Sequence, residues 1–193
     1  MDLIYEKISP SDIFIDEREV WARLGGIGSV SDEKIKEVIG EISLAASPVF
    51  ASRELSVRVN NGKCVYTDEL TVPGENFANM IGSSSHILVV CATLGAGVDR
   101  LIYKKSSLSV SDGFIYDAVA SAMAEGLINL VEVKCTSGKE HTRRFSPGYG
   151  DMPIEIQGDI LQILDASRRL GLVLTESNLM IPTKSVTALI GMR

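Results

Sequence analysis

The sequence predicts an α+β fold, a single domain in which helices pack against an antiparallel sheet. The stretch from 112 to 133 carries apolar residues at helical spacing and is the strongest helix signal in the chain. Short β-prone runs lie between 55 and 72 on either side of Asn60-Asn61-Gly62, a hairpin turn signal. Strands and helices are partly segregated along the chain, which favours α+β over a doubly wound parallel sheet.

The length and composition fit one globular domain. A chain of 193 residues can bury a sizeable core, and 45% hydrophobic with 23% charged residues excludes disordered and collagen-like classes. The chain shows no internal repeat and no linker. We therefore expect a single domain over 1–193, with 1–50 as a helical N-terminal arm and 51–193 as the α+β core.

Several functional classes are disfavoured. A net charge of -6 argues against nucleic acid as a partner. The longest apolar run, Ile87 to Leu94, is far below the roughly 18 residues of a membrane span, and Met1 to Glu6 does not resemble a secretory signal, so we expect a cytoplasmic protein with no membrane partner. Cys64, Cys91 and Cys135 are too far apart for a zinc motif or a disulfide framework.

The first half of the chain predicts two helices, a hairpin and a buried strand in that order. The helices are expected at Asp16–Leu24, ended by Gly25-Gly26, and from Ser31 to Ser47-Pro48. The hairpin is expected from Ser56–Val59 and Cys64–Thr67. A helical stretch near 76–81 then precedes a central strand at 87–92 and a helix at about 98–104.

The turn Thr93-Leu94-Gly95-Ala96-Gly97 between that strand and helix could cradle a phosphate, but it lacks the Gly-Lys-Ser/Thr of a P-loop and the third glycine of a dinucleotide turn. Asp99 would also repel an anion there. We expect the glycines to be structural.

The second half centres on the helix from Asp112 to about Val133. Small residues recur every fourth position along it, at Ala118, Ala122 and Gly126, so another element can approach its backbone closely. A polar row lies alongside them and consists of Asp117, Ser121 and Glu125. A further helix at 155–170, closed by Gly171, and a terminal hairpin of 172–175 with 185–190 complete the expected elements.

The loop from Thr142 to Pro153 is the best candidate for a binding site. Arg144 supplies planar paired donors that suit a carboxylate. Pro147 and Gly148 predict a turn whose amides face outward, and Tyr149 offers a flat face with a polar tip. Such a loop can bind a small zwitterion.

Two motifs in this part of the chain resemble a known family. Arg-x-x-x-Gly-Tyr at 144–149 is followed after a helix by Leu174-Thr175-Glu176-Ser177, and then by Met180, Pro182, Ser185 and Val186. This pair of motifs resembles the activation domain of cobalamin-dependent methionine synthase, the S-adenosylmethionine-binding module of that enzyme. The resemblance is densest from about Tyr116 to Val186, and it implies the fold of that domain.

The resemblance implies roles for six residues. Arg144 would clamp the ligand carboxylate, and Glu125 would receive its ammonium group. The alternatives are a solvated surface arginine and a solvated helix glutamate.

Ser146, Pro147 and Gly148 match the loop whose backbone contacts the ligand in the family, and Tyr149 matches the motif tyrosine. A plain structural turn is the rival interpretation for the loop, and packing of the ring onto the core is compatible with the role of Tyr149. Glu176 is assigned a structural role in the second motif, and Asp16 is left unassigned.

The chain departs from the family in two places. After Gly-Tyr it has Gly150-Asp151-Met152-Pro153-Ile154-Glu155, where only Pro153 matches. Aromatic residues that help to enclose the ligand in the family are replaced by Leu189 and Ile190. His86 and His141 have no partner that suggests a metal site, and no nucleophile with a base is recognisable, so we expect neither catalytic residues nor a metal.

The resemblance implies a reactivation module or subunit. It would present S-adenosylmethionine to cobalamin held by a methionine synthase core or another corrinoid protein, while a flavodoxin-type donor supplies an electron. The role would be placement, because a sulfonium is already an activated methyl donor. The alternative is a non-enzymatic docking protein that keeps the scaffold and binds a corrinoid methyltransferase without using S-adenosylmethionine.

Overall fold

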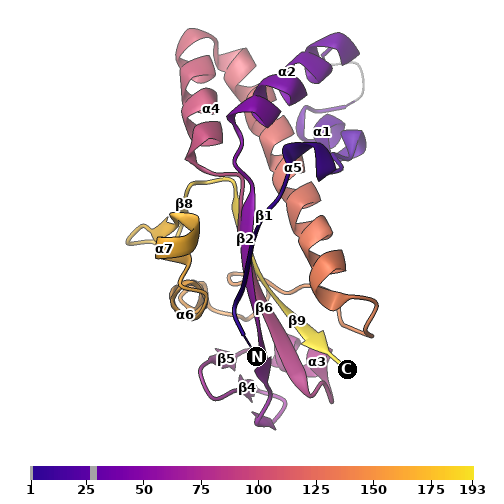
Figure 1. Ribbon diagram of the computed structural model, residues 1–193, viewed down its shortest axis with the longest axis vertical. Helices are drawn as coiled ribbons and strands as arrows, with labels where there is room; N and C mark the ends of the chain where they lie inside the picture. The colour runs from indigo at the N-terminus through magenta and orange to yellow at the C-terminus, as the bar shows by residue number, and fades with distance from the viewer. Residues whose placement is uncertain (1, 27–29) are drawn as a thin grey trace.

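A four-stranded antiparallel sheet lies at the centre of the computed structural model, which describes residues 2–26 and 30–193 (Figure 1). Its strands, in spatial order, are β1 (Ile4–Lys7), β2 (Val49–Ser56), β6 (His86–Thr93) and β9 (Ser185–Met192). Every neighbouring pair is antiparallel. The predicted α+β class is confirmed, and so is the central strand at 87–92.

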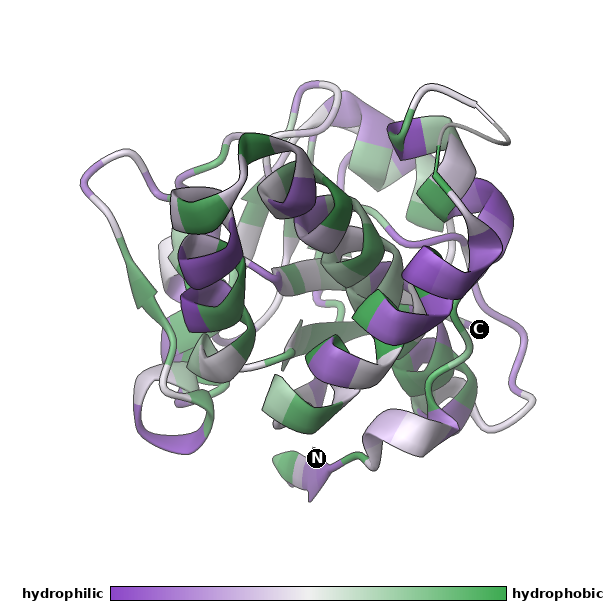
Figure 2. Cartoon of the chain, turned by 90° about the horizontal axis from the view of Figure 1, so that it is seen from above, coloured by the Kyte–Doolittle hydropathy of each residue, from purple (hydrophilic) through white to green (hydrophobic). Residues whose placement is uncertain are grey.

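Helices cover one face of this sheet. They are α1 (Glu17–Arg23), α2 (Asp32–Ala45), α4 (Ala96–Leu108) and α5 (Val110–Thr136). Phe50, Leu88 and Val90 point from the strands into this layer, and Met123 and Leu127 of α5 pack in the same cluster. The helices of the molecule carry both hydrophobic and hydrophilic residues (Figure 2).

Shorter elements cover the opposite face. They are α3 (Glu75–Ile81), α6 (Ile156–Ile163), α7 (Ala166–Leu170) and a small sheet of β3 (Val59–Asn60), β4 (Cys64–Tyr66) and β5 (Thr71–Pro73). Ile87, Val89 and Leu189 alternate with the residues that face the first layer and pack here against Phe77 and Ile160. Because β6 is buried on both faces, its sequence is a continuous apolar run rather than an alternating one.

The first fifty residues, which we expected to form a helical arm, also contribute to the sheet and the core. β1 pairs with β2, and Val20 and Trp21 of α1 and Val38 of α2 are buried in the same cluster as α5. The expected helices are present, with the side chains of Asp16 and Ser31 as their N-terminal caps.

The segment before α1 crosses α5 at Gly126. An ideal Cβ at Gly126 would lie 2.1 Å from the carbonyl oxygen of Phe14. The small residue at this position of α5 therefore lets another backbone approach the helix closely, as predicted.

The glycine-rich turn before α4 is explained by packing. An ideal Cβ at Gly97 would lie 2.1 Å from the carbonyl oxygen of Ala45, and Gly95 has a φ of +85°. Asp99 accepts hydrogen bonds from the backbone N–H of Thr183 at 2.7 Å and from its hydroxyl at 3.0 Å. These glycines allow α2 and α4 to meet, and Asp99 fixes the loop before β9.

Two elements differ from the prediction in their boundaries. The first long strand begins at Val49, not near Ser56. The single helix expected over 155–170 is two helices, because Asp165 between them adopts the left-handed conformation with a φ of 49°. Gly171 ends the second of these helices, as expected.

The expected terminal hairpin is wrong. β7 (Val173–Leu174) pairs with β8 (Met180–Ile181), whereas β9 pairs with β6 across the full length of both strands. β9 is mostly apolar and is buried along most of its length, so a position in the central sheet leaves less hydrophobic surface exposed than a local hairpin would.

Helix α5 is long and apolar enough to cross a membrane by length and composition alone. In the structure 67% of its most apolar window is buried, and it packs against α1, α2, α4 and the sheet. Its apolar character is therefore accounted for by its place in the core.

Candidate ligand-binding site

One cleft brings together five of the six residues predicted to bind a ligand. Glu125 lies on α5, and Arg144, Ser146, Pro147 and Tyr149 lie on the loop that follows this helix. The cleft has a volume of about 570 Å³, within the roughly 300–1,000 Å³ typical of small-molecule sites. Residues of α6, β8 and β9 complete its walls.

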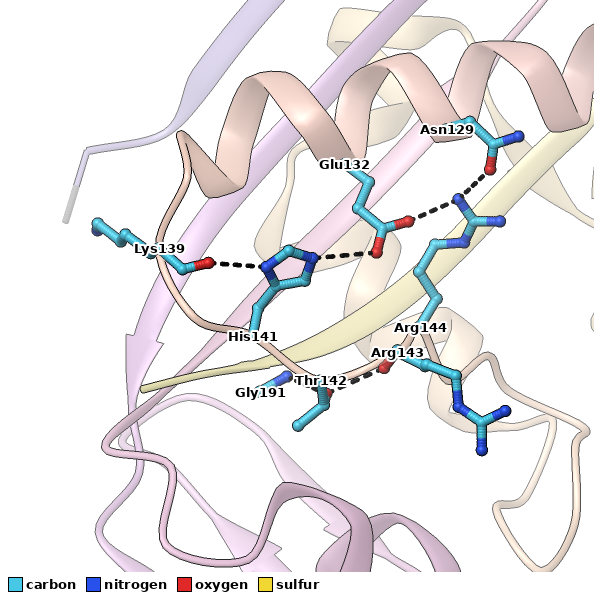
Figure 3. A network of polar contacts seen from close by, with 8 residues as sticks. All are labelled: Asn129, Glu132, Lys139, His141, Thr142, Arg143, Arg144 and Gly191. Carbon is cyan, nitrogen blue, oxygen red and sulfur yellow. Dashed lines mark hydrogen bonds and ion pairs between the residues drawn. The ribbon is translucent and has the colours of Figure 1, made fainter.

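Arg144 is held against α5 (Figure 3). Its Nη1 donates to Asn129 Oδ1 at 2.7 Å and to Glu132 Oε2 at 2.9 Å. Its Nη2 lies 3.5 Å from Glu125 Oε2, and the side chain is only 23% exposed. The alternative of a solvated surface arginine is therefore excluded. The neighbouring Arg143 is exposed and points away from Glu132 in Figure 3.

The partners of Arg144 share one face of the helix. Glu125, Asn129 and Glu132 are separated by four and three residues, so their side chains stack along α5. The sequence reasoning found Glu125 but missed Asn129 and Glu132. Their spacing from Glu125 was the available signal, and it becomes informative only once the loop is known to lie beside this face.

The polar row continues towards the other end of the helix. Lys184, just before β9, donates to Asp117 Oδ1 at 2.7 Å and to Ser121 Oγ at 3.0 Å. The row from Asp117 to Glu125 thus joins α5 to the segments on both sides of the cleft.

The turn after Arg144 is closed by its own hydrogen bonds. Gly148 N–H donates to the carbonyl of Met152 at 3.0 Å, and Tyr149 N–H donates to that of Ser146 at 3.2 Å. The expectation that these amides face outward is therefore wrong. Gly148 has a φ of +84° and is not among the residues that line the cleft, so its requirement for glycine is conformational.

Tyr149 is free to act as a surface for a ligand. Its side chain lines the cleft and is 70% exposed, so it does not pack the loop onto the core. That packing comes from Phe145, whose ring lies 5.8 Å from the ring of Phe77 and whose backbone pairs with Leu189 of β9. Tyr149 therefore forms an open rim.

Comparisons with known proteins identify the fold. No protein-family model and no curated protein matches the chain. Among solved structures, it is similar to the MetH reactivation domain in a crystal structure with AdoHcy bound, with a TM-score of 0.73 and 14% sequence identity over 99% of this chain and 78% of that one. The chain has the fold of the MetH reactivation domain. The activation-domain fold implied by the two motifs is confirmed.

The segment in which the chain departs from the reactivation-domain motif has a structural role of its own. The backbone N–H of Glu75 donates a hydrogen bond to Asp151 Oδ2 at 2.6 Å. The backbone N–H of Asn76 lies 3.3 Å from both oxygens of the same carboxylate. The carboxylate thus caps α3, which begins after Gly74 and has no cap from its own segment. This contact anchors the cleft loop on the far side of the sheet.

We expect Asp151→Ala to lower the free energy of unfolding by about 1 kcal/mol, since a lost N-terminal cap typically costs that much. Urea unfolding followed by circular dichroism measures the change. Asp151→Asn keeps an acceptor oxygen and is expected to lose less. Equal losses in both variants would contradict a capping role.

The reactivation-domain fold places the replaced aromatic positions inside the sheet. Leu189 and Ile190 are fully buried and do not line the cleft. The apolar wall comes instead from Phe145, Ile154, Met180 and Val186. Tyr149 lies at the rim of this wall.

The floor of the cleft contains a fixed polar group that sequence reasoning missed. Gln157 of α6 accepts from Thr187 Oγ1 at 2.8 Å and donates to the carbonyl of Asn178 at 3.2 Å. Gln157 and Thr187 are buried, so these bonds hold α6, β9 and the β7–β8 turn together. Gln157 thereby links α6 to segments that flank the second motif.

Other candidate residues have structural roles or none. Glu176, expected to brace the second motif, is exposed, and its carboxylate makes no hydrogen bond or ion pair with any residue that the structure describes. Within the described ranges 2–26 and 30–193, no group of three His, Cys, Asp or Glu residues is arranged to hold a metal. The three cysteines are free, and burial raises the pKa of the Cys91 thiol.

Proposed function

We propose that the cleft binds S-adenosylmethionine and that the protein presents this methyl donor to cobalamin held by a partner, which returns an oxidised corrinoid to its active state. The single observation that carries the proposal is the pairing of Arg144 with Glu125 at the mouth of an apolar-walled cleft. The fold is that of a domain whose crystal structure contains AdoHcy.

The charges of the cleft suit this ligand. The amino-acid end of S-adenosylmethionine is a zwitterion, and a guanidinium 3.5 Å from a carboxylate offers one partner to each of its charges. Glu125 and Glu132 together place two negative charges around Arg144, so the site favours a ligand whose sulfonium gives it a net positive charge. The volume and the apolar wall suit the ribose and adenine.

The residues of the chain would bind and orient the ligand. The sulfonium supplies an activated methyl group, so no general base is required of the protein. Arg144 and Glu125 would fix the amino-acid end, and Tyr149 would leave the rim accessible to a partner. We propose a cobalamin-dependent methionine synthase core or another corrinoid protein as that partner, a flavodoxin-like protein as electron donor, and the cytoplasm as the location.

Calorimetry with S-adenosylmethionine tests the first half of the proposal. We expect binding at one site per chain, with weaker binding of S-adenosylhomocysteine, because its sulfur is neutral. Absence of heat from both ligands, with the protein folded by circular dichroism, would refute the ligand role.

Absorption spectra of a partner corrinoid test the second half. A methionine synthase core that lacks its own activation domain is oxidised and supplied with a reductant. We expect the spectrum of methylcobalamin to appear only when this protein and S-adenosylmethionine are both present.

One observation favours the alternative of a docking protein that does not use S-adenosylmethionine. Arg144 Nη1 and the amides of Gly148 and Tyr149 already have partners within the protein. A docking protein would neither bind S-adenosylmethionine nor bring about the appearance of methylcobalamin, so the same two experiments distinguish the alternatives.

A further inference from the structure

The carboxylate of Glu132 lies between a guanidinium and an imidazole. Its Oε2 accepts from Arg144 Nη1 at 2.9 Å, and its Oε1 lies 3.5 Å from His141 Nε2 (Figure 3). The Glu132 side chain is 21% exposed, so water screens these contacts only in part. Glu132 is thus shared between the proposed ligand clamp and an imidazole outside the cleft.

A hydrogen bond on the other side of the imidazole decides which ring nitrogen of His141 carries the proton when the ring is neutral. His141 Nδ1 lies 2.8 Å from the carbonyl oxygen of Lys139, which can only accept, so Nδ1 carries the proton. In the neutral ring Nε2 then carries no proton, and its lone pair faces the carboxylate of Glu132. In the protonated ring Nε2 becomes a donor, and the contact with Glu132 becomes a charge-assisted hydrogen bond.

The other charged groups near His141 have partners elsewhere. Lys139 Nζ lies 3.6 Å from Glu54 of β2, and Arg193, after β9, pairs with Glu140 at 2.7 Å. Arg144 faces Glu132 from the opposite side. Among the described residues, Glu132 is therefore the carboxylate that responds to the charge on the imidazole.

We infer that Glu132 is a positioning residue for Arg144 and that protonation of His141 weakens its hold on Arg144 by pairing with the other oxygen of the same carboxylate, so that the affinity for S-adenosylmethionine falls as the pH falls. This inference rests on the proposed function. Two effects would weaken binding at low pH. Arg144 is held less firmly by Glu132, and a new positive charge lies near a site for a cationic ligand. S-adenosylhomocysteine lacks the sulfonium charge, so its affinity is expected to change less.

Calorimetry between pH 5.5 and 7.5 tests the inference. In the parent protein we expect the dissociation constant of S-adenosylmethionine to rise about fivefold towards the acid end, the lower limit of typical coupling between sites. In His141→Gln this rise is expected to disappear. In Glu132→Gln the affinity is expected to be about threefold to tenfold weaker at pH 7.5 and independent of pH, because the ion pair with Arg144 becomes a hydrogen bond to an uncharged amide.

His86→Gln is the matched control, because His86 is the other histidine of the chain and its Nδ1 contacts Ser85 Oγ at 2.9 Å, not the cleft. It is expected to behave as the parent. An equal pH dependence in His141→Gln and the parent would overturn the inference and leave the proposed function intact.

A measurement without ligand tests the coupling of His141 to Arg144 separately from the proposed binding of S-adenosylmethionine. We expect the NMR signal of the Arg144 Nε–H group to move between pH 5.5 and 7.5 in the parent and in His86→Gln, and to stay fixed in His141→Gln. If this pattern appears while S-adenosylmethionine does not bind, the coupling holds and the proposed function fails. If the Arg144 signal is insensitive to His141, the coupling itself is refuted.

Discussion

Replacing Arg144 with alanine is expected to weaken binding of S-adenosylmethionine about 30-fold to 150-fold, which corresponds to roughly 2–3 kcal/mol. The change removes the proposed partner of the ligand carboxylate. It also leaves Glu125 and Glu132 facing the cleft without their shared cation. The estimate is at the lower end for partly buried charge pairs, since 23% of the Arg144 side chain is exposed. Calorimetry measures the effect directly.

Arg143→Ala provides a matched control for this variant. It removes the same charge from the adjacent position, but Arg143 is exposed and does not line the cleft. We expect less than about a twofold change in affinity, as for a screened surface charge. If the two alanine variants lose affinity to the same extent, the net charge of the loop and not a clamp governs binding.

Replacing Gly126 with alanine is expected to lower the free energy of unfolding by about 3 kcal/mol, at the upper end of the usual cost of overpacking. An ideal Cβ there would lie 2.1 Å from the carbonyl oxygen of Phe14 and 3.0 Å from a methyl group of Ile13. The first of these atoms belongs to a backbone and cannot rotate away. The segment before α1 must therefore move off α5. Urea unfolding of the two proteins measures the loss.

Gly40→Ala separates this clash from the general effect of a new methyl group. Gly40 lies within α2, is exposed, and has no atom within 4 Å of an ideal Cβ. Because alanine favours helix more than glycine does, we expect Gly40→Ala to stabilise the protein by about 0.5–1 kcal/mol. A destabilised Gly40→Ala, or an unchanged Gly126→Ala, would contradict the role assigned to close packing.

Local patterns predicted the elements whose signals lie within one segment. Helix α5, the turn at 60–62 and the buried strand β6 were all found, because periodicity and turn chemistry are local properties. The partner of β9 was not found. An apolar strand carries no local mark of its neighbour, and its pairing with β6 depends on the burial of the whole sheet. The break at Asp165 was missed for a similar reason, since aspartate adopts positive φ values only where its surroundings require them.

The candidate site was predicted in part. Residues of the loop motif were recognisable as a short pattern, and Glu125 was found by its position on the scaffold helix. Glu132, Asn129 and Gln157 carry no such pattern, since they belong to the site only because distant segments meet there. The roles of these residues towards a ligand stay predictions.

The walls of the cleft come from segments that are far apart along the chain. Glu125 belongs to α5, the turn that begins at Arg144 follows, and Met180 and Val186 arrive some forty residues later on β8 and β9. A short peptide cut from the chain would not contain all of these walls. An arginine followed by glycine and tyrosine in an unrelated protein would therefore have no binding competence of its own, and transplanting the motif would require transplanting the entire domain.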